Sequence, residues 1–504
     1  MIHLGVKYLR ILEPVKIQIL AYSWCQVEKP PLLSFFLDRA KRVSLQTQLA
    51  LHFKQLVHDG MLRPGRTVPS SRELARDLQV SRNTVLQAYD RLMGEGYLQS
   101  SPRRGLYVSE SLKESQLLKA GSPEIASDPP ERFYRDHFNA LQPPLPFRPC
   151  QPDVRLFPLQ LWNRARTRAL RRHGTSILHY QSHSPLGLRE LRRSLASYLQ
   201  GSRGVRCDWR QIAITTGSQQ ALFLLAYLLL TPGDTVAMED PGYLGARLAW
   251  GNVRATIEPV PVDAAGMKLD TRRNFSPKLI YTTPSRQYPT GSCLSLARRL
   301  ELVEFSSRKE AWIIEDDYDS EFRYARAPLP SLQSLDSTQR VVYVGSTSKA
   351  LFPSLRIGYA VLPEPLVEKF AELRAAVDEH GPLIDQATLA EFIESGAFFR
   401  HVRRSRREYA LRLEAFLDSA TKFALPLQFP FTDGGMNLAG FLGSIADDAE
   451  FSERLKKKGL DTPPLSRYSL RSTSPGLLFG FTAFEPKVIR KSLQLASKVL
   501  TCGY

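Results

Sequence analysis

A proline-dense stretch over residues 111–158 divides this chain of 504 residues into two unequal parts. Its prolines are Pro123, Pro129, Pro130, Pro143, Pro144, Pro146, Pro149, Pro152 and Pro158. Proline at this density prevents a continuous helix and favours an extended, semi-rigid connector. We therefore expect a multidomain protein with an unassigned N-terminal extension (1–40), a small domain (41–110), a linker (111–158) and a large domain (159–504).

The composition restricts the partners and the compartment. The 68 Lys and Arg residues exceed the 50 Asp and Glu residues, and the net charge of +18 favours a polyanionic partner such as nucleic acid. The five cysteines are widely spaced and form no C-x-x-C pair, which argues against a disulfide framework and a structural zinc site. We expect no metal and a reducing, cytoplasmic compartment. No segment has the roughly 20 uninterrupted apolar residues that cross a bilayer, so no membrane partner is expected.

The small domain is basic and predicts a helix-turn-helix. Apolar residues at helical spacing predict a first helix over residues 45–59. A second helix begins near Ser70, which has capping-box spacing to Glu73, and Ser81 can cap a third. Only a short turn separates the second helix from the third, an arrangement that lets the third helix enter the major groove of DNA.

A short hairpin is predicted over residues 97–108, with basic residues at its tip aimed at phosphates or the minor groove. Arg and Asn side chains can hydrogen-bond base edges, whereas Thr can contact a phosphate or a thymine methyl group. A helical hairpin with a solvated charged face is the alternative interpretation. The residues expected to contact DNA are Arg72, Ser81, Arg82, Asn83, Thr84, Arg103 and Arg104.

The large domain alternates short apolar runs with segments of helix length, which predicts an α/β fold with a mostly parallel central sheet. Three of its segments carry candidate chemistry. A strand runs into Gly217 at the start of a helix, a typical phosphate cradle. Another strand ends in Asp316 at the edge where such sheets bind ligands. Lys349 follows a third strand, with Arg356 as a second cation.

Each of these features alone has an ordinary structural explanation: a glycine turn, a solvated strand end or a surface lysine. Residues 346–349 also match S-x-x-K, the signature of serine β-lactamases, but the companion S-D-N and K-T-G elements are absent. Together, a phosphate cradle, a strand-end aspartate and a downstream lysine are what pyridoxal 5′-phosphate requires. We therefore expect this cofactor.

These motifs carry a resemblance to a known family. The segment "GMLRPGRTVPSSRELARDLQVSRNTVLQAYDRLMGEGYL" resembles the GntR-type winged-helix DNA-binding domain over residues 45–108. Residues 150–500 are similar to a fold-type-I aminotransferase domain, with a large part at about 175–360 and a small part at about 361–504. This fusion is the plan of MocR-type transcriptional regulators.

The resemblance implies roles for individual residues. Lys349 is expected to form the internal aldimine with pyridoxal phosphate, Asp316 to pair with the pyridine nitrogen and Tyr318 with the phenolic oxygen. Tyr180 is expected to reach the phosphate of the neighbouring subunit, which implies a homodimer. The other residues expected to bind the cofactor are Gly217, Ser218, Gln219, Tyr243, Ser346, Ser348 and Arg356.

The sequence also departs from the family pattern around the substrate side of the site. Arg286 replaces a usual His, Tyr288 stands where true aminotransferases have an Asn, and Cys150 replaces a common Gly. Asp461 stands where a GABA-responsive relative has an effector-binding Arg, and "GLLFGFTAF" lacks a carboxylate-binding Arg. The cofactor pocket is expected to be kept and the substrate pocket altered.

The leading hypothesis is a transcription regulator whose head binds double-stranded promoter or operator DNA. Its aminotransferase-like body senses pyridoxal phosphate or a small amino compound, with residual transaminase activity at most. One alternative is a catalytically active aminotransferase with a vestigial head. Another is a cofactor-free regulator that uses the body only for dimerisation.

Overall fold

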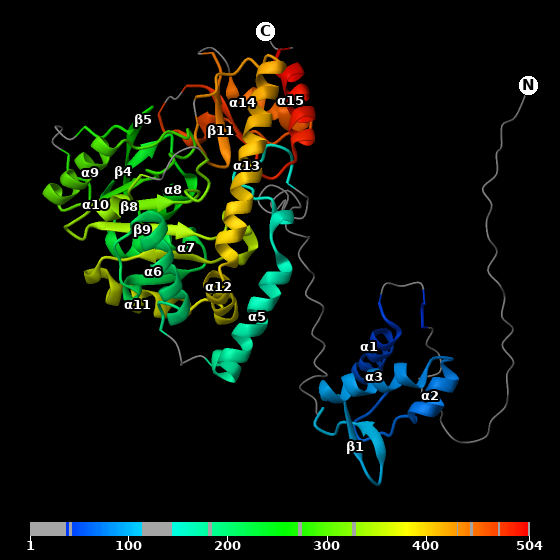
Figure 1. Cartoon of the computed structure of the whole chain (residues 1–504). Helices are drawn as coiled ribbons and strands as arrows, with labels where there is room; N and C mark the ends of the chain where they lie inside the picture. The colour runs from blue at the N-terminus through cyan, green and yellow to red at the C-terminus, as the bar shows by residue number, and fades with distance from the viewer. Residues whose placement is uncertain are drawn as a thin grey trace, which may run out of the picture. The chain divides into compact units, whose positions relative to one another are not determined.

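The computed structural model describes residues 37–39, 43–112, 144–179, 184–270, 275–324, 329–430, 432–443, 447–471 and 474–501. The chain forms two compact units, Met1–Leu141 and Gln142–Tyr504 (Figure 1). We refer to them as the head and the body. Within the described ranges, no helix is long and apolar enough to cross a membrane.

The head contains the predicted three helices and hairpin. Each helix begins after a serine whose Oγ accepts a hydrogen bond from a backbone N–H of the first turn: Ser44 from Thr47, Ser70 from Glu73 and Ser81 from Thr84. A compact apolar core that includes Phe53 and Leu92 lies between the helices and the hairpin. The elements are α1 (Leu45–His58), α2 (Ser71–Asp77), α3 (Arg82–Gly94), β1 (Leu98–Ser101) and β2 (Gly105–Val108).

An eight-stranded sheet organises the body, in the order β3-β10-β9-β8-β7-β4-β5-β6. Strands β5, β4, β7, β8 and β9 are parallel to one another, whereas β3, β10 and β6 pair antiparallel. This confirms the mostly parallel sheet. The strands are β3 (Ile212–Thr215), β4 (Thr235–Asp240), β5 (Thr256–Asp263), β6 (Gly266–Met267), β7 (Leu279–Thr282), β8 (Trp312–Asp317), β9 (Val341–Ser346) and β10 (Gly358–Val361).

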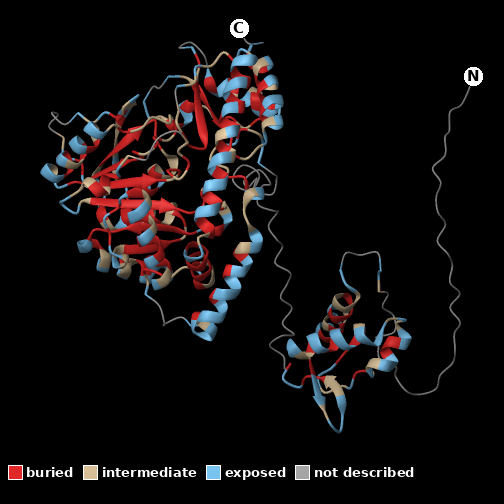
Figure 2. Ribbon diagram, in the orientation of Figure 1, coloured by how far each residue is buried: buried red, intermediate tan, exposed pale blue. Residues whose placement is uncertain are grey.

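Helices cover both faces of this sheet, which explains why its central strands are almost wholly buried and mainly apolar, although β4 and β8 end in acidic residues (Figure 2). On one face, Val236 and Met238 of β4 pack with Trp250 and Phe370. On the other, Ala237 packs in a cluster with Phe305. The helices of this part are α5 (Leu159–His173), α6 (Arg189–Arg203), α7 (Ser218–Leu229), α8 (Leu244–Asn252), α9 (Leu296–Lys309), α10 (Leu332–Leu335), α11 (Glu364–Asp378) and α12 (Leu383–Glu394).

A smaller layer completes the body. Its two-stranded antiparallel sheet, β11 (Asn437–Phe441) and β12 (Gly476–Gly480), shares a core with the helices around it. These helices are α13 (Ala397–Lys422), α14 (Asp448–Lys457) and α15 (Pro486–Thr501). Short 3₁₀ turns are η2 (Val154–Leu156), η3 (Gly174–Leu178), η4 (Trp209–Gln211), η5 (Pro353–Leu355) and η6 (Leu465–Tyr468).

The structure differs from the expected linker at its C-terminal end. Residues 144–158 belong to the body: Phe147 is buried, with its ring 5.4 Å from that of Phe479. The carboxylate of Asp153 binds Arg412 at 2.8 Å. Proline density indicates an extended backbone, but it does not reveal whether that backbone packs against a core. The rest of the expected linker, residues 113–143, and residues 1–36 lie outside the described ranges.

Candidate functional site

The predicted cofactor residues converge on one cavity of about 210 Å³ at the ends of the parallel strands. Its lining includes Ser218, Gln219, Tyr243, Asp316, Tyr318, Ser346, Ser348, Lys349 and Arg356. Gly217 adjoins the cavity through Arg356. Tyr180 lies outside the described residues, so its expected contact with a neighbouring subunit stays a prediction. The structure therefore brings together segments that are far apart in the sequence.

Asp316, at the end of β8, has one satisfied and one free carboxylate oxygen. Its Oδ2 accepts a hydrogen bond from the Tyr281 hydroxyl at 2.7 Å, whereas its Oδ1 is buried and has no hydrogen-bond partner among the described residues. Burial raises the pKa of Asp316 from 3.8 to about 7, although the Tyr281 hydrogen bond opposes this shift. A buried carboxylate oxygen at a cavity wall is ready to pair with a cationic N–H group of a ligand.

Lys349 meets the chain segment that enters the body from the linker side. Its Nζ donates a hydrogen bond to the backbone oxygen of Cys150 at 3.0 Å. Cys150 has a positive φ of 59°, which a non-glycine residue rarely adopts. Asn437 fixes this conformation, because its Oδ1 accepts from the Cys150 N–H at 2.6 Å and its Nδ2 donates to the Cys150 sulfur at 3.2 Å.

The other end of the cavity is built to receive an anion. Gly217 has a φ of 79°, and a Cβ atom at this position would lie 2.7 Å from Arg356 Nη2. Arg356 in turn donates to the backbone oxygen of Thr216 at 3.1 Å. The hydroxyl of Ser348 is buried without a hydrogen-bond partner in the described part of the chain. A glycine turn, the N-terminus of α7, a guanidinium and a free hydroxyl form a cradle suited to phosphate.

Tyrosines form one wall of the site. The Tyr288 ring meets the rings of Tyr243, Tyr318 and Tyr468 edge to face, at centroid distances of 5.9, 5.7 and 5.3 Å. Burial raises the pKa of Tyr243 to about 12, so its hydroxyl stays protonated. The Tyr288 N–H donates to Thr283 Oγ1 at 3.0 Å, which fixes the loop that carries this ring.

Sequence reasoning missed Tyr281, Thr283, Asn437 and Tyr468. Tyr281 and Thr283 come from β7 and the loop after it, beside β8 in the sheet. Finding them requires the strand order, which the alternation of strands and helices does not supply. Asn437 is 287 residues from Cys150 and shares no local pattern with it.

The arginines near the site are held by protein groups. Arg286 binds Thr432 Oγ1 at 2.6 Å, the backbone oxygen of Asn437 and, at 3.6 Å, the Asp319 carboxylate. Arg247 binds the backbone oxygen of Tyr468 and lies 3.4 Å from Asp240. Neither arginine is among the residues that line the cavity, and Asp461 is not among them either.

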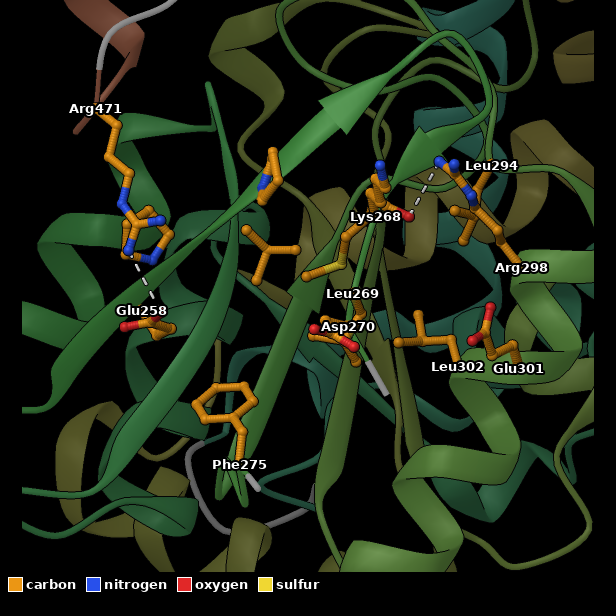
Figure 3. Close-up of a pocket in the computed structure, with 14 residues that line it drawn as sticks. Glu258, Lys268, Leu269, Asp270, Phe275, Leu294, Arg298, Glu301, Leu302 and Arg471 are labelled. Atoms are coloured by element: carbon orange, nitrogen blue, oxygen red, sulfur yellow. Dashed lines mark hydrogen bonds and ion pairs between the residues drawn. The ribbon is translucent and has the colours of Figure 1, made fainter. Parts of the chain in front are cut away.

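A second, larger cavity of about 580 Å³ lies at the β5–β6 edge of the sheet. Figure 3 shows Arg471 facing Glu258 on one side of it and Arg298 on the other. Arg471 pairs with Glu258 at 3.4 Å, and Arg298 pairs with Asp263 at 2.6 Å. This cavity contains none of the residues that the sequence singled out, and its arginines are engaged in ion pairs.

The head places the predicted DNA-contacting residues on its surface. Arg72, Arg82 and Asn83 are exposed near the starts of α2 and α3, and Arg103 and Arg104 are exposed at the hairpin tip. Arg82 Nε donates to Ser71 Oγ at 3.3 Å, which ties the start of α3 to α2.

Three other expected residues also have protein partners. The Ser81 hydroxyl caps α3 and lies 2.8 Å from Thr84 Oγ1, and Thr84 is half-buried. Arg104 pairs with Glu110 at 3.2 Å. An exposed pair of this kind is weak and opens at little cost.

Comparisons with known proteins match both units. The family described as "Bacterial regulatory proteins, gntR family" matches residues 45–108, and "Aminotransferase class I and II" matches residues 159–466. The "Probable rhizopine catabolism regulatory protein MocR" of Rhizobium meliloti is 34% identical, over 91% of this chain and 94% of its own. The "HTH-type pyridoxine biosynthesis transcriptional regulator PdxR" of Corynebacterium glutamicum is 32% identical, over 94% of this chain and 99% of its own.

Solved structures resemble the body. The kynurenine aminotransferase of Pyrococcus horikoshii, solved with PMP and its substrates and products, is 26% identical with a TM-score of 0.68, over 74% of this chain and 94% of its own. LysN, the alpha-aminoadipate aminotransferase of Thermus thermophilus, is 27% identical with a TM-score of 0.66, over 71% of this chain and 92% of its own. The chain belongs to the MocR-type regulators, in which a GntR-family helix-turn-helix domain is joined to a fold-type-I aminotransferase domain.

Proposed function

We propose that this protein is a pyridoxal 5′-phosphate-dependent transcription regulator whose head binds operator DNA and whose body senses the cofactor or an amino compound. The observation that carries this proposal is one cavity that contains Lys349, the Oδ1 of Asp316, which no described residue binds, and the cradle formed by Gly217 and Arg356. Binding of pyridoxal phosphate would explain why a lysine, a buried acid and an anion site lie together in this cavity.

The residues fit the cofactor group by group. When bound, pyridoxal phosphate supplies an aldehyde that a lysine amine can attach to and a ring that withdraws electrons once its nitrogen is protonated. Lys349 provides the amine, and Asp316 Oδ1 holds the proton at the ring nitrogen. Ser348 and Arg356 would provide donors for the phosphate, and Tyr243, which lines the cavity, would contact the ring.

The contact between Lys349 and Cys150 suggests how the site influences the head. Cys150 lies in the part of the expected linker that packs on the body, and this segment is also joined to the small layer, where the Gly480 N–H donates to the backbone oxygen of Phe147. When a ligand binds the Lys349 amine, the Cys150 carbonyl loses the N–H group that donates a hydrogen bond to it. We propose that the segment then changes its conformation, so that ligand state biases the linker.

We also propose that the protein acts as a homodimer. The proposal rests on the family resemblance of the segment around Tyr180, and the preceding Leu178 is 67% exposed, which leaves this part of the surface open to a partner. A partner subunit would cover Leu178 and bring Tyr180 to the neighbouring cavity.

The test is the visible absorption spectrum of the purified protein and of Lys349→Ala during titration with pyridoxal phosphate. We expect an absorption band in the wild type only. Amino compounds are then added while the affinity for promoter DNA is measured. A band that shifts with one amine and changes DNA affinity supports the sensor.

Two other results would contradict the proposal. Transfer of the amino group to pyridoxal phosphate, which yields pyridoxamine phosphate and a carbonyl compound, without an effect on DNA would indicate an aminotransferase. A wild type without a Lys349-dependent band would indicate a body that serves only for dimerisation.

A further inference from the structure

Two helices of the body carry exposed arginines that the cofactor site does not use. Helix α5 contains no acidic residue, and the first turns of α13 contain none between Arg400 and Arg407. All of the arginines in these two stretches are exposed: Arg164, Arg166, Arg168, Arg171 and Arg172 on α5, and Arg400, Arg403, Arg404, Arg406 and Arg407 on α13. We call them the α5 face and the α13 face.

Helical spacing gathers the charges on the outer side of each helix. Arg400, Arg403, Arg404 and Arg407 follow the i, i+3, i+4, i+7 spacing of one helical face, while Val402 and other residues between them are buried. On α5, the buried residues are Trp162, Ala165 and Ala169, which leaves the arginines outside. Figure 2 shows both helices exposed along their outer sides.

The two helices that carry these faces pack on the same neighbour beneath them. Both helices contact α12. Phe157, just before α5, meets the ring of His401 on α13 at a centroid distance of 5.6 Å. Arg404 faces this buried histidine closely enough that its charge, added to the effect of burial, lowers the pKa of His401 to about 4. A neutral His401 packs against Phe157 without adding a further buried charge.

Most of these arginines keep their charge unneutralised. Arg168 and Arg172 bind Glu391 on α12, at 3.4 and 2.7 Å. By contrast, no ion pair to another described residue is formed by Arg164, Arg166, Arg171, Arg403, Arg404 or Arg407. Crowding like charges in this way has an electrostatic cost that a polyanion would relieve.

We propose that the α5 and α13 faces bind the phosphate backbone of DNA outside the stretch read by the helix-turn-helix. Both faces use only arginine as the cation, and its planar guanidinium can bind a phosphate through two hydrogen bonds. DNA is the polyanion that a GntR-type regulator already meets, and a backbone contact requires charge but no apolar groove. The proposal rests on DNA binding by the head, and it adds a contact without sequence preference.

The experiment compares two duplexes with the full-length, cofactor-loaded protein. One carries the operator alone, and the other extends it by roughly 30 base pairs, or about 100 Å, on each side. The variant Arg403→Gln/Arg404→Gln/Arg407→Gln removes three charges from the α13 face. The control Lys457→Gln/Lys458→Gln/Lys487→Gln removes the same charge from exposed positions on and near α14 and α15.

We expect the arginine variant to bind the long duplex about tenfold more weakly than the wild type, with a salt slope reduced by about 2 to 3, because each lost phosphate contact reduces the slope by nearly one. Its affinity for the operator duplex should be unchanged, and the lysine control should behave as the wild type on both. A parallel variant, Arg164→Gln/Arg171→Gln, should show a smaller loss of the same kind. The absorption band of the cofactor and the mass in solution serve as folding controls.

Three outcomes would overturn the proposal: no loss on the long duplex, equal losses on both duplexes, or the same loss in the lysine control. A change in subunit number for the arginine variant would identify the α13 face as a subunit contact instead. Failure of the wild type to bind the short operator duplex would contradict the proposed function of the head, and this result is separate from any effect of the arginine variants.

Discussion

The two units build their sites in opposite ways. In the head, the candidate DNA-contacting residues lie between Arg72 and Arg104, on the starts of two capped helices and one hairpin tip. In the body, the cavity depends on contacts such as Cys150 with Asn437, which are 287 residues apart. A site made of local structure needs only its own small core, whereas a site made of distant segments needs the whole sheet.

The units also differ in how they hold charge. The candidate arginines of the head are exposed and accessible to a polyanion. The body instead buries carboxylates, and burial raises the pKa of Asp316 and of Asp319 to about 7. Buried charge costs stability and produces a specific site, so the body should respond to ligand and pH while the head responds mainly to salt.

The largest expected effect tests whether the two units are independent. Phe53 is fully buried in the head, with its ring 5.5 Å from that of Tyr89. Replacing Phe53 with Ala should lower the free energy of unfolding of the head by about 3–5 kcal/mol, which is enough to unfold a small domain. We expect Phe53→Ala to lose DNA binding and the calorimetric unfolding transition of the head, while the cofactor band of the body persists. The reciprocal variant Phe370→Ala should weaken the body alone; a joint shift of both transitions would contradict independence.

The contrast between local and distant contacts also explains what the sequence can predict. The head follows from local signals: a first helix was expected over residues 45–59 and spans Leu45–His58, and Ser70 and Ser81 cap the next two. The turn between α2 and α3 and the hairpin after α3 also follow from local sequence signals. The order of these elements along the chain is consistent with packing around one small core.

In the body, sequence identified the segments but not their neighbours. Lys349 and Asp316 stand out because each follows an apolar strand, and the family resemblance adds Tyr243. Nothing local relates Cys150 to Lys349, because their contact depends on how an extended, proline-rich segment packs. The strand order likewise decides that Tyr281 binds Asp316, and it arises from the whole sheet.

A second prediction concerns the pH dependence of the cofactor-free body. The folded pKa of Asp316, about 7, lies above its ordinary value of 3.8. The folded state therefore keeps a proton that the unfolded chain releases, and the free energy of unfolding falls as pH rises from about 4 to about 7. Asp316→Asn removes the group whose deprotonation lowers the free energy of unfolding. The cofactor-free variant should therefore be more stable than the wild type by roughly a few kcal/mol at pH 8 and as stable as the wild type near pH 4. Denaturant titrations at the two pH values measure this, and an equal difference at both would contradict it.

The same substitution should have the opposite effect on the loaded protein. An asparagine side chain cannot supply the negative charge that holds a proton at the ring nitrogen, so Asp316→Asn should weaken cofactor affinity by about 10- to 100-fold, the equivalent of one charged hydrogen bond. Spectroscopic titration measures the affinity. Asp319→Asn is the matched control, because Asp319 is buried two residues beyond β8 but does not line the cavity. Equal losses in both variants would indicate a general effect of charge.

In the head, smaller effects separate base reading from phosphate contact. Arg82 is exposed at the start of α3, and Arg103 is exposed at the hairpin tip. Arg82→Ala should cost about 1–3 kcal/mol on the operator and relax specificity, whereas Arg103→Ala should weaken all sequences evenly and reduce the salt slope by about one. Binding to operator and scrambled duplexes over a salt series distinguishes the two. An even loss on all sequences for Arg82→Ala would remove it from the base-reading residues.

The smallest effect separates helix capping from DNA contact at Ser81. Ser70 and Ser81 each accept a hydrogen bond from a backbone N–H, at 3.2 and 3.1 Å, and both are exposed. Replacing either with Ala should lower the stability of the head by about 1 kcal/mol, the usual contribution of an N-cap. Because the Ser81 hydroxyl is already held by Thr84, we expect the two variants to lose the same stability and nearly the same DNA affinity. A loss of affinity confined to Ser81→Ala, at equal stability, would show that this hydroxyl also binds a phosphate and that even a capping residue of the head contributes directly to DNA binding.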